Sequence, residues 1–567
     1  MKKFLALVLA MLMLVSVFAG CAKTPATDNN DNNNPTDNNK PDDNDNKGTE
    51  DAEAPGPAQL LLPVPQNMAD VFPPVWDNYG GVYRMMVFSR LLRLDTDLNP
   101  VYKDLAADFS VSDDYLTYEF TVRDDVKWHD GEPFTAEDVE WTVKTALRYP
   151  ETNNVIRSSL AAIEGGKAYW DKESEEIPGM TVDGNKITFK LSQTNSTFQL
   201  VMAQLNILPK HLLENVDPLT MKTDSYWAKP IGTGPWMVDE FIPNDYAILK
   251  AFPDYFGPKP QIEEVKLSYI TEADYVVRTQ ANEIDYFQTN DYATAAEIEK
   301  NPNYSVNPVD IYFVRYLTWN SNGPQQNGDD PLSDIRSRRA ILHAIDRASI
   351  VEQLMPGAAT VIDTKVPPHI KDWYNDDTYK YDYNPEKAKQ LLEEANFDFS
   401  KKIRIACYYT DQLSADLMDL IVDYLSKVGI QAEWFLITGD ITTQLYSVAD
   451  YNLMYGGLSA MCPEEAYNAF SSDTIKGGAT ASILPTEPNV MDDLIKELNL
   501  AADPAKKADI LKQLQALEND MLYHLMLFAP KNFIIYNKAR LDIPQIFSND
   551  WSNYERKMEE WVVKAKG

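Results

Sequence analysis

The first candidate for chemistry is the stretch RDDVKWHDGEPFTAEDVEW, residues 123–141, which places several carboxylates close to His129. Carboxylate and imidazole groups bind metal ions and transfer protons, so such a cluster could serve catalysis. Thr135 and Asp138, however, have the spacing of a capping box at a helix start, and Asp130-Gly131 suits a turn. A site also needs groups that converge from elsewhere in the chain. The stretch therefore predicts a strand–turn–helix scaffold, with neither a catalytic nor a metal role.

Other motifs for metal, redox or phosphate chemistry are missing from the sequence. Its five histidines are scattered, and no HExxH, CxxC or GxxxxGK[ST] pattern occurs. These absences predict no zinc site, no metal or other cofactor, and no ATP hydrolysis by the chain itself. In an exported protein Cys407 and Cys462 could either pair or remain buried thiols, and the sequence leaves both possibilities open.

Length and charge narrow the class of protein. At 567 residues the chain exceeds the roughly 250–300 residues that one hydrophobic core usually supports, so two or more lobes are expected. A hydrophobic content of 44% is typical of a folded globular protein. The 52 lysines and arginines stand against 86 acidic residues, and the net charge of -34 repels phosphate backbones. We therefore expect no nucleic-acid partner.

The N-terminus has the pattern of an export signal. Lys2 and Lys3 precede an apolar stretch from Phe4 to Phe18, which is shorter than the about 20 residues that a membrane span needs. The tripeptide Ala19-Gly20-Cys21 then resembles the lipobox of bacterial lipoproteins, in which the cysteine is acylated. We expect residues 1–20 to be a signal peptide and Cys21 to carry the lipid. The alternative is ordinary secretion after cleavage at the small residues.

A polar segment follows the predicted lipid site. Residues 22–58 contain nine Asn and nine Asp or Glu, with almost no large apolar side chain. Such a composition buries too little surface to offset the entropy of ordering, so we expect a disordered tether. The predicted location is thus the outer face of the cytoplasmic membrane, reached through the lipid anchor alone.

Several segments resemble family 5 extracellular solute-binding proteins, the oligopeptide- and dipeptide-binding lipoproteins of ABC importers. YEFTVRDDVKWHDGEPFTAEDVEW is similar to the strand–turn–helix segment of that family. Five further motifs follow in the family's order: PIGTGPWMVDEFIPNDYAILKAFPDYFG, QANEIDYF, DIRSRRAILHAIDRASIVEQLMPG, YNPEKAKQLLEEANF and LMDLIVDYLSKVGIQAEW. The resemblance extends from Tyr118 to Trp434, and together with the lipobox it is specific.

The resemblance implies a mixed α/β fold with two lobes, of the type II periplasmic-binding-protein kind, with an extra inserted domain and a ligand cleft between the lobes. Lobe I is expected from three separate segments, the inserted domain from one, and lobe II from one. In that order they are residues 59–94, 216–321 and 526–567 for lobe I, residues 95–215 for the inserted domain, and residues 322–525 for lobe II. The lobes are expected to close on the ligand by a hinge motion.

The function that the resemblance implies is transport, with no enzyme activity. The protein would capture a peptide or another small solute and deliver it to ABC permease subunits with their ATPases, working as a monomer. The alternative is an exported hydrolase, such as a glycosidase that uses two carboxylates about 5–9.5 Å apart. The sequence alone reveals no such pair.

The resemblance leaves the ligand open between a peptide and another small solute. In peptide-binding members an aspartate pairs with the α-amine of the ligand, and ungapped matching of ADYNLMYGGLSAMCPEEAYNAF, residues 449–470, places Met461 at that position. Either Glu464 or Glu465 substitutes from nearby, or the ligand has no free amine and is a sugar or another solute. A pocket-wall or core role for Met461 is the structural alternative. Met461, Cys462 and Glu464 are the predicted ligand-binding residues of this segment.

Aromatic residues supply the other predicted ligand contacts. Trp76 and Tyr79 lie where the family places residues of the cleft, and Trp319-Asn320 stand where a strand leaves toward the crossover between lobes. Aromatic faces stack on sugar rings and amide planes, and an asparagine can both donate and accept hydrogen bonds. A role in the core is the alternative for each tryptophan.

Overall fold

The computed structural model describes residues 59–65, 68–73, 76, 81–95, 99–485, 489–547 and 556–564. These residues all belong to one compact unit, Ala58–Gly567. The predicted signal peptide, Cys21 and the tether lie outside the described residues. None of the helices in the described part of the chain combines the length and the apolar character needed to cross a bilayer.

The first sheet has four strands in the order β1-β10-β9-β8. Their bounds are β1 Gln59–Val64, β10 Glu264–Tyr269, β9 Tyr246–Ala251 and β8 Trp236–Ile242. β1 pairs in parallel with β10, and the other pairs are antiparallel. The GTGPW turn precedes β8 and lies against the end of helix α2, Gly81–Val87. A Cβ built on Gly232 would stand 1.8 Å from the carbonyl oxygen of Val87, so the backbone approach here requires a glycine.

The second sheet, order β4-β5-β7-β6, also has four strands. Their bounds are β4 Ala106–Val111, β5 Thr117–Val122, β7 Lys186–Lys190 and β6 Met180–Asp183. After β5 the chain turns into helix α3, Ala136–Arg148, which begins with the predicted capping box between Thr135 and Asp138. Helices α4 to α7 complete this region: Asn154–Ala161, Gly166–Trp170, Phe198–Met202 and Lys210–Leu213.

His129 serves the scaffold of the first two sheets. Its Nε2 lies 2.9 Å from the carbonyl oxygen of Gly234, and its Nδ1 accepts the N–H of Gly232 at 3.1 Å. Burial lowers the pKa of His129 to about 4, so the imidazole is neutral when it holds the glycine turn. The scaffold role predicted for residues 123–141 is therefore confirmed.

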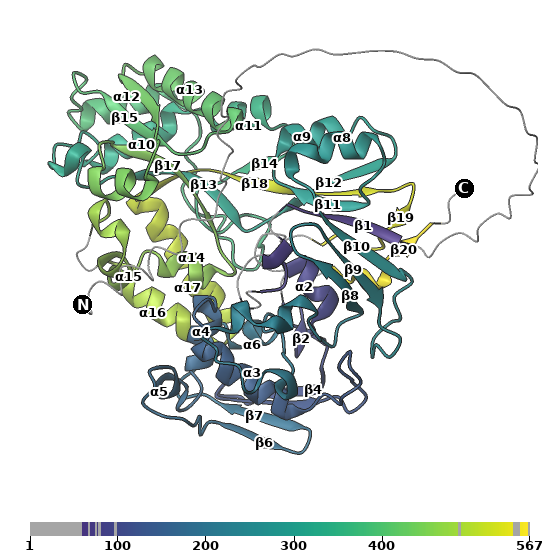
Figure 1. Cartoon of the computed structure of the whole chain (residues 1–567). Helices are drawn as coiled ribbons and strands as arrows, with labels where there is room; N and C mark the ends of the chain where they lie inside the picture. Colours follow the sequence, from purple (N-terminus) through teal and green to yellow (C-terminus); the bar gives the residue numbers. More distant parts are fainter. Residues whose placement is uncertain are drawn as a thin grey trace, which may run out of the picture. The chain divides into compact units, whose positions relative to one another are not determined.

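The third sheet has eight strands and joins segments from distant parts of the sequence. Its main path is β11-β18-β13-β17-β15-β16, and β12 and β14 also pair with β18. The bounds are β11 Tyr286–Thr289, β12 Tyr304–Asp310, β13 Phe313–Trp319, β14 Ala359–Val361, β15 Ile403–Cys407, β16 Ala432–Leu436, β17 Leu453–Ser459 and β18 His524–Asn537. In Figure 1 the long yellow strand β18 runs from β13 and β14 to β11 and β12.

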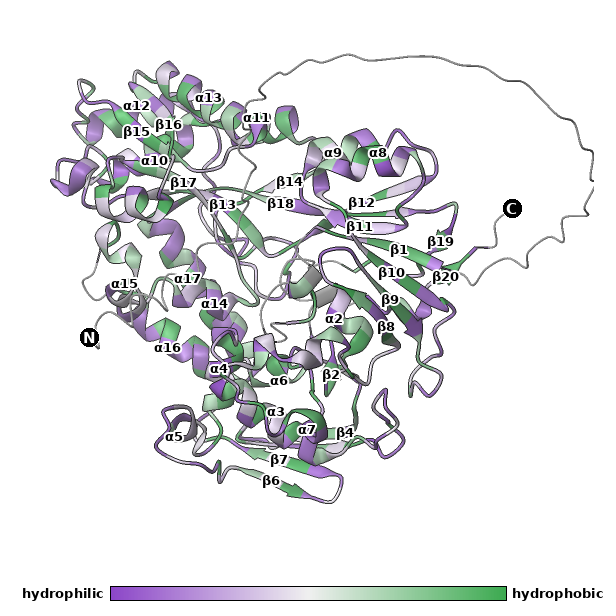
Figure 2. Cartoon of the chain, in the orientation of Figure 1, coloured by the Kyte–Doolittle hydropathy of each residue, from purple (hydrophilic) through white to green (hydrophobic). Residues whose placement is uncertain are grey.

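Helices surround this third sheet. Their bounds are α8 Tyr275–Gln280, α9 Tyr292–Ile298, α10 Ile335–Ala344, α11 Arg347–Leu354, α12 Pro385–Glu394, α13 Gln412–Lys427, α14 Pro463–Asn468, α15 Ser472–Gly477, α16 Asp492–Leu500 and α17 Pro504–Met521. α12 is capped at its start, since the Asn384 side chain accepts the N–H of Lys387. Gly429 follows α13 with φ +88°, which suits a glycine at the C-terminal cap. In Figure 2, α8, α9 and α13 each carry green and purple turns, as helices with one buried side do.

Two large hydrophobic cores divide the fold. One lies under the first and second sheets, and the other packs around the eight-stranded sheet and α10 to α13. Short pairs complete the fold: β2 Leu92–Arg93 with β3 Tyr102–Lys103, and β19 Leu541–Asp542 with β20 Val562–Val563. Residues 194–196 bind the end of α16, where Thr194 Oγ1 donates to the carbonyl of Leu500 at 2.7 Å and the N–H of Ser196 to that of Asn499 at 3.0 Å. The predicted inserted domain thus contacts the predicted lobe II directly.

We predict that Gly232→Ala lowers the free energy of unfolding by about 1–3 kcal/mol, because the new methyl group collides with backbone and not with a movable side chain. Denaturant titration followed by tryptophan fluorescence measures the change. Gly477→Ala is the matched control, since a Cβ there meets nothing within 4 Å. Equal stability of the two variants would contradict the packing role of the turn.

Candidate functional site

Trp76 lies inside the fold. Its side chain is fully buried, its Nε1 donates to the carbonyl of Asn206 at 2.9 Å, and its ring meets Tyr149 edge-on. Its own carbonyl accepts the N–H of Asn153, which caps α4. In this arrangement the indole packs in the core, and the ligand contact stays a prediction. Tyr79 lies outside the described residues.

Trp319 and Asn320 fix the crossover that follows β13. Trp319 Nε1 donates to Asp330 Oδ2 at 2.5 Å, and the guanidinium of Arg338 stacks on the indole at 3.8 Å. The amide Nδ2 of Asn320 donates to three backbone carbonyls, those of Gly323, Ala449 and Tyr451. Both side chains therefore position the connection between chain segments, and their ligand contacts stay predictions.

The segment after β17 joins the two cores. Met461 and Cys462 are buried and belong to the core of the first two sheets, although β17 itself lies in the third sheet. The N–H of Met461 donates to Glu465 Oε2 at 2.6 Å, and Asn153 Nδ2 donates to Glu465 Oε1 at 3.5 Å. Asn153 comes from the predicted inserted domain, so the segment lies where three regions of the fold meet.

Glu464 forms a buried ion pair. Its Oε1 lies 2.6 Å from Nζ of Lys507, and the two side chains are only 2% and 10% exposed. The Lys507 ammonium also lies 4.3 Å from the ring centre of Trp373. The carboxylates of Glu464 and Glu465 are thus both engaged within the protein, although either was a predicted substitute for the missing aspartate.

The two cysteines are both buried and unpaired. Cys407 ends β15, whereas Cys462 precedes α14. Burial raises the pKa of the Cys462 thiol well above its usual range and that of Cys407 to about 11. Of the two possibilities left open by the sequence, the structure therefore has free, protonated thiols rather than a disulfide.

Glu518 of α17 is the centre of a second buried polar cluster, which contacts the residues after Glu465. The backbone N–H of Lys365 and the Tyr467 hydroxyl both donate to Glu518 Oε2, at 3.1 and 2.9 Å. The Lys365 ammonium lies 3.1 Å from the ring centre of Phe470, and burial lowers its pKa to about 7. Burial raises the pKa of Glu518. These groups anchor residues 467–470 on α17, because the polar contacts connect those elements directly.

An arginine among aromatic rings is the feature that sequence reasoning missed. Arg315 lies in the middle of β13, and its guanidinium carbon is 4.1 Å from the ring centre of Tyr409, 4.7 Å from that of Phe313 and 5.4 Å from that of Tyr455. Tyr408 and Tyr409 share a hydrogen bond between their hydroxyls at 2.9 Å. The signal in the sequence was a charged residue inside the apolar strand YFVRYLTW, together with a tyrosine pair directly after a strand.

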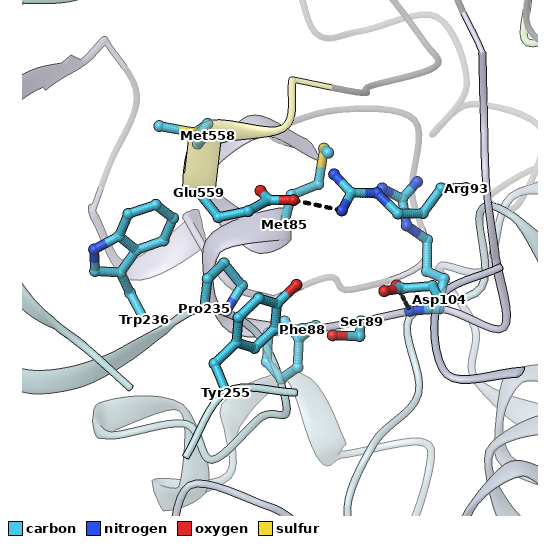
Figure 3. A pocket seen from close by; sticks show the side chains of 11 residues that line it. Met85, Phe88, Ser89, Arg93, Asp104, Pro235, Trp236, Tyr255, Met558 and Glu559 are labelled. Atoms are coloured by element: carbon cyan, nitrogen blue, oxygen red, sulfur yellow. Dashed lines mark hydrogen bonds and ion pairs between the residues drawn. The ribbon is translucent and has the colours of Figure 1, made fainter. Parts of the chain in front are cut away.

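A small cavity lies in the region of the first sheet. Figure 3 shows Arg93 and Asp104 on one side of the cavity and Trp236 on the other, with Glu559 and Tyr255 between them. Its charges are matched internally: Arg93 Nη1 lies 2.6 Å from Glu559 Oε1, and Asp104 accepts the N–H of Arg90. Because these groups already have partners, the cavity is a weaker candidate for ligand binding than the region around Arg315.

In the described part of the chain, no group of three or more His, Cys, Asp or Glu side chains could hold a metal ion. Around residues 461–465 the N–H of Met461 donates to Glu465 and the Glu464 carboxylate pairs with Lys507, and two large hydrophobic cores make up most of the fold. The class that the fold defines is thus a two-lobed, mixed α/β protein of the type II periplasmic-binding-protein kind.

Residues 100–477 match the family of bacterial extracellular solute-binding proteins, family 5 Middle, and the chain belongs to that family. The predicted resemblance and fold class are confirmed. Family membership identifies a binding protein and not an enzyme, so the alternative of an exported hydrolase has no support.

Two relatives match this chain over most of its length and most of their own. The oligopeptide-binding protein AppA of Bacillus subtilis is 28% identical over 476 residues, covering 79% of this chain and 81% of AppA. The dipeptide-binding protein of Escherichia coli is 26% identical over 510 residues, covering 83% and 90%. Among solved structures, the ABC transporter substrate-binding protein CtaP of Listeria monocytogenes has a TM-score of 0.74 at 20% identity, covering 89% of this chain and 99% of that chain. AppA in complex with a nonapeptide has a TM-score of 0.67 at 23% identity, with the same coverage.

We predict that Lys507→Met lowers the free energy of unfolding by about 3–5 kcal/mol, because it leaves the Glu464 carboxylate buried without its partner. The double variant Glu464→Gln with Lys507→Met should recover most of the loss. Lys506→Met, at the exposed neighbouring position, is the control and should change stability by less than about 0.5 kcal/mol. Chemical denaturation measures all three, and a Lys507→Met protein as stable as the control would contradict the buried ion pair.

Proposed function

We propose that this chain is a lipid-anchored peptide-binding protein that delivers its ligand to an ABC permease and the associated ATPases. The observation that carries the proposal is the match to AppA and to the dipeptide-binding protein over about four fifths of the chain. The AppA complex with a nonapeptide has the same fold and supports a peptide as the ligand.

Peptide capture would take place between the lobes assigned from the sequence, with the inserted domain at residues 95–215 and lobe II at residues 322–525. The hydrogen bonds from Thr194, Ser196 and Asn153 to lobe II support a closed arrangement of these parts. A binding protein must distinguish its liganded from its empty form, so the ligand has to favour closure by its differential affinity for the two states. Trp76, Tyr79, Trp319 and Asn320 remain the proposed aromatic and amide contacts for the open state.

Native mass spectrometry of the protein, purified without denaturation, tests whether the bound ligand is a peptide. We predict a ladder of bound masses that corresponds to short peptides, since the related proteins bind peptides of different lengths. Added free peptides should displace the ladder, whereas an added oligosaccharide serves as the control and should not. A single bound mass that fits a sugar would contradict the peptide proposal.

Anchoring has its own test. We predict that Cys21→Ser moves the protein from the membrane fraction to the medium and abolishes labelling by a radioactive fatty acid, because only acylation at Cys21 attaches the chain to the bilayer. Cys407→Ser is the control, and it should remain labelled because it keeps Cys21 and changes only a buried thiol in β15. Unchanged labelling of the Cys21 variant would show that another residue carries the lipid, and an unlabelled wild-type protein in the medium would show ordinary secretion.

A further inference from the structure

Arg315 occupies space that a glycine leaves open. Arg315 and Phe313 point to the same side of β13, and the residue opposite Arg315 on β17 is Gly457. A Cβ at Gly457 would stand 2.8 Å from Cζ of Phe313 and 3.0 Å from Nη1 of Arg315. The guanidinium therefore lies across the backbone of β17, in a position that any other residue at 457 would obstruct.

Three aromatic rings hold the guanidinium at this position. Tyr409 follows β15, Tyr455 lies in β17 and Phe313 in β13, so neighbouring strands of one sheet supply them. Guanidinium groups stack on aromatic faces and keep their N–H groups in the plane free to donate. The rings thus orient the cation without neutralising its charge.

No carboxylate of the described residues pairs with Arg315. Its Nη1 is shielded from solvent and has no hydrogen-bond partner among them. The nearby Asp411 instead caps α13, where its carboxylate accepts the N–H and the hydroxyl of Ser414, both at 2.8 Å. Other shielded arginines have oxygen partners, as Arg347 does with Asp363 at 2.8 Å. The chain has 86 acidic residues, yet none of the described ones pairs with Arg315. A shielded cation without a partner is costly, so a bound anion would stabilise it.

We propose that Arg315 binds a carboxylate of the ligand and is its main charged anchor. The inference rests on the proposed function, because it places the ligand against β13 and β17. It also accounts for the segment after β17: Met461 offers no charge for an α-amine, and the carboxylates of Glu464 and Glu465 are engaged by Lys507 and by the backbone of Met461. A guanidinium fork suits a carboxylate, which can accept two parallel hydrogen bonds. The carboxylate is either the C-terminus of a peptide or an Asp or Glu side chain.

The test compares chemically blocked peptides on the wild-type protein and on Arg315→Met. A synthetic pool of short peptides without Asp or Glu is offered in three forms: free, N-acetylated and C-amidated. Titration calorimetry on the species retained in native mass spectrometry gives the affinities. We expect N-acetylation to change affinity little, and C-amidation or Arg315→Met to lower it about 10- to 100-fold. The two changes should not add, because each removes the same pair.

Further variants separate binding from folding. Arg315→Lys keeps the positive charge but loses the two parallel N–H donors of the guanidinium. Its affinity for the free peptides should therefore lie between those of the wild type and Arg315→Met. Arg278→Met removes an exposed arginine that pairs with Glu283, and it should bind like wild type. Thermal unfolding of every variant is measured alongside. Amidated peptides that carry one Glu distinguish the two sources of the carboxylate, since they regain affinity only if a side chain can reach Arg315.

Failure of the Arg315 anchor and failure of the peptide function give different results. Unchanged binding by a folded Arg315→Met protein, or loss of affinity on N-acetylation but not on amidation, would overturn the Arg315 anchor and leave the peptide function intact. If the wild-type protein takes no peptide in any form, the proposed function fails. The anchor is then judged on the co-purified ligand: an anionic ligand that Arg315→Met loses supports it, and a neutral or cationic ligand overturns it.

Discussion

The backbone hydrogen bonds of β18 are the constraint on which the rest of the fold depends. This one strand pairs with β11 and β12 through its second half and with β13 and β14 through its first half. The segments that it joins lie between about residues 286 and 361, far from it in sequence. Because a buried strand must satisfy its N–H and C=O groups, the late segment 524–537 fixes how the earlier ones are arranged.

Placement of charge follows from the same arrangement. Glu464 and Lys507 neutralise each other inside the fold, and the buried ammonium of Lys365 donates to the carbonyl oxygen of Ala466 at 3.4 Å. A buried charge without a partner is costly, so such pairs are what a folded core tolerates. Arg315 departs from this pattern, since aromatic rings surround it in place of oxygen atoms. In a binding protein that closes on its ligand, one buried charge can lack a partner until the ligand supplies it. Closure then depends on whether the ligand is bound.

Local features of the fold could be predicted where a short segment carries its own physical reason. The capping box at Thr135 formed as expected, and the Asn384 cap with Pro385 behind it and the glycine turn before β8 likewise depend on a few neighbouring residues. The partner of His129 could not be predicted, since Gly232 and Gly234 lie about a hundred residues away. The same holds for Glu464, whose use depends on Lys507 in another helix. Of the proposed ligand contacts, Trp76 and Asn320 are held by backbone carbonyls that only the folded chain brings near.

The sequence by itself determined the family, the mixed α/β class and the acidic, folded character of the chain, because ordered local motifs and composition survive without tertiary contacts. It also determined that residue 461 is a methionine and so offers no carboxylate for an amine. Only the tertiary structure decided that Cys407 and Cys462 stay apart as thiols, that Glu464 is engaged, and that Arg315 lies among three rings opposite Gly457. Those outcomes depend on distances between strands and helices far apart in the chain, and such distances are set by packing and not by any local pattern.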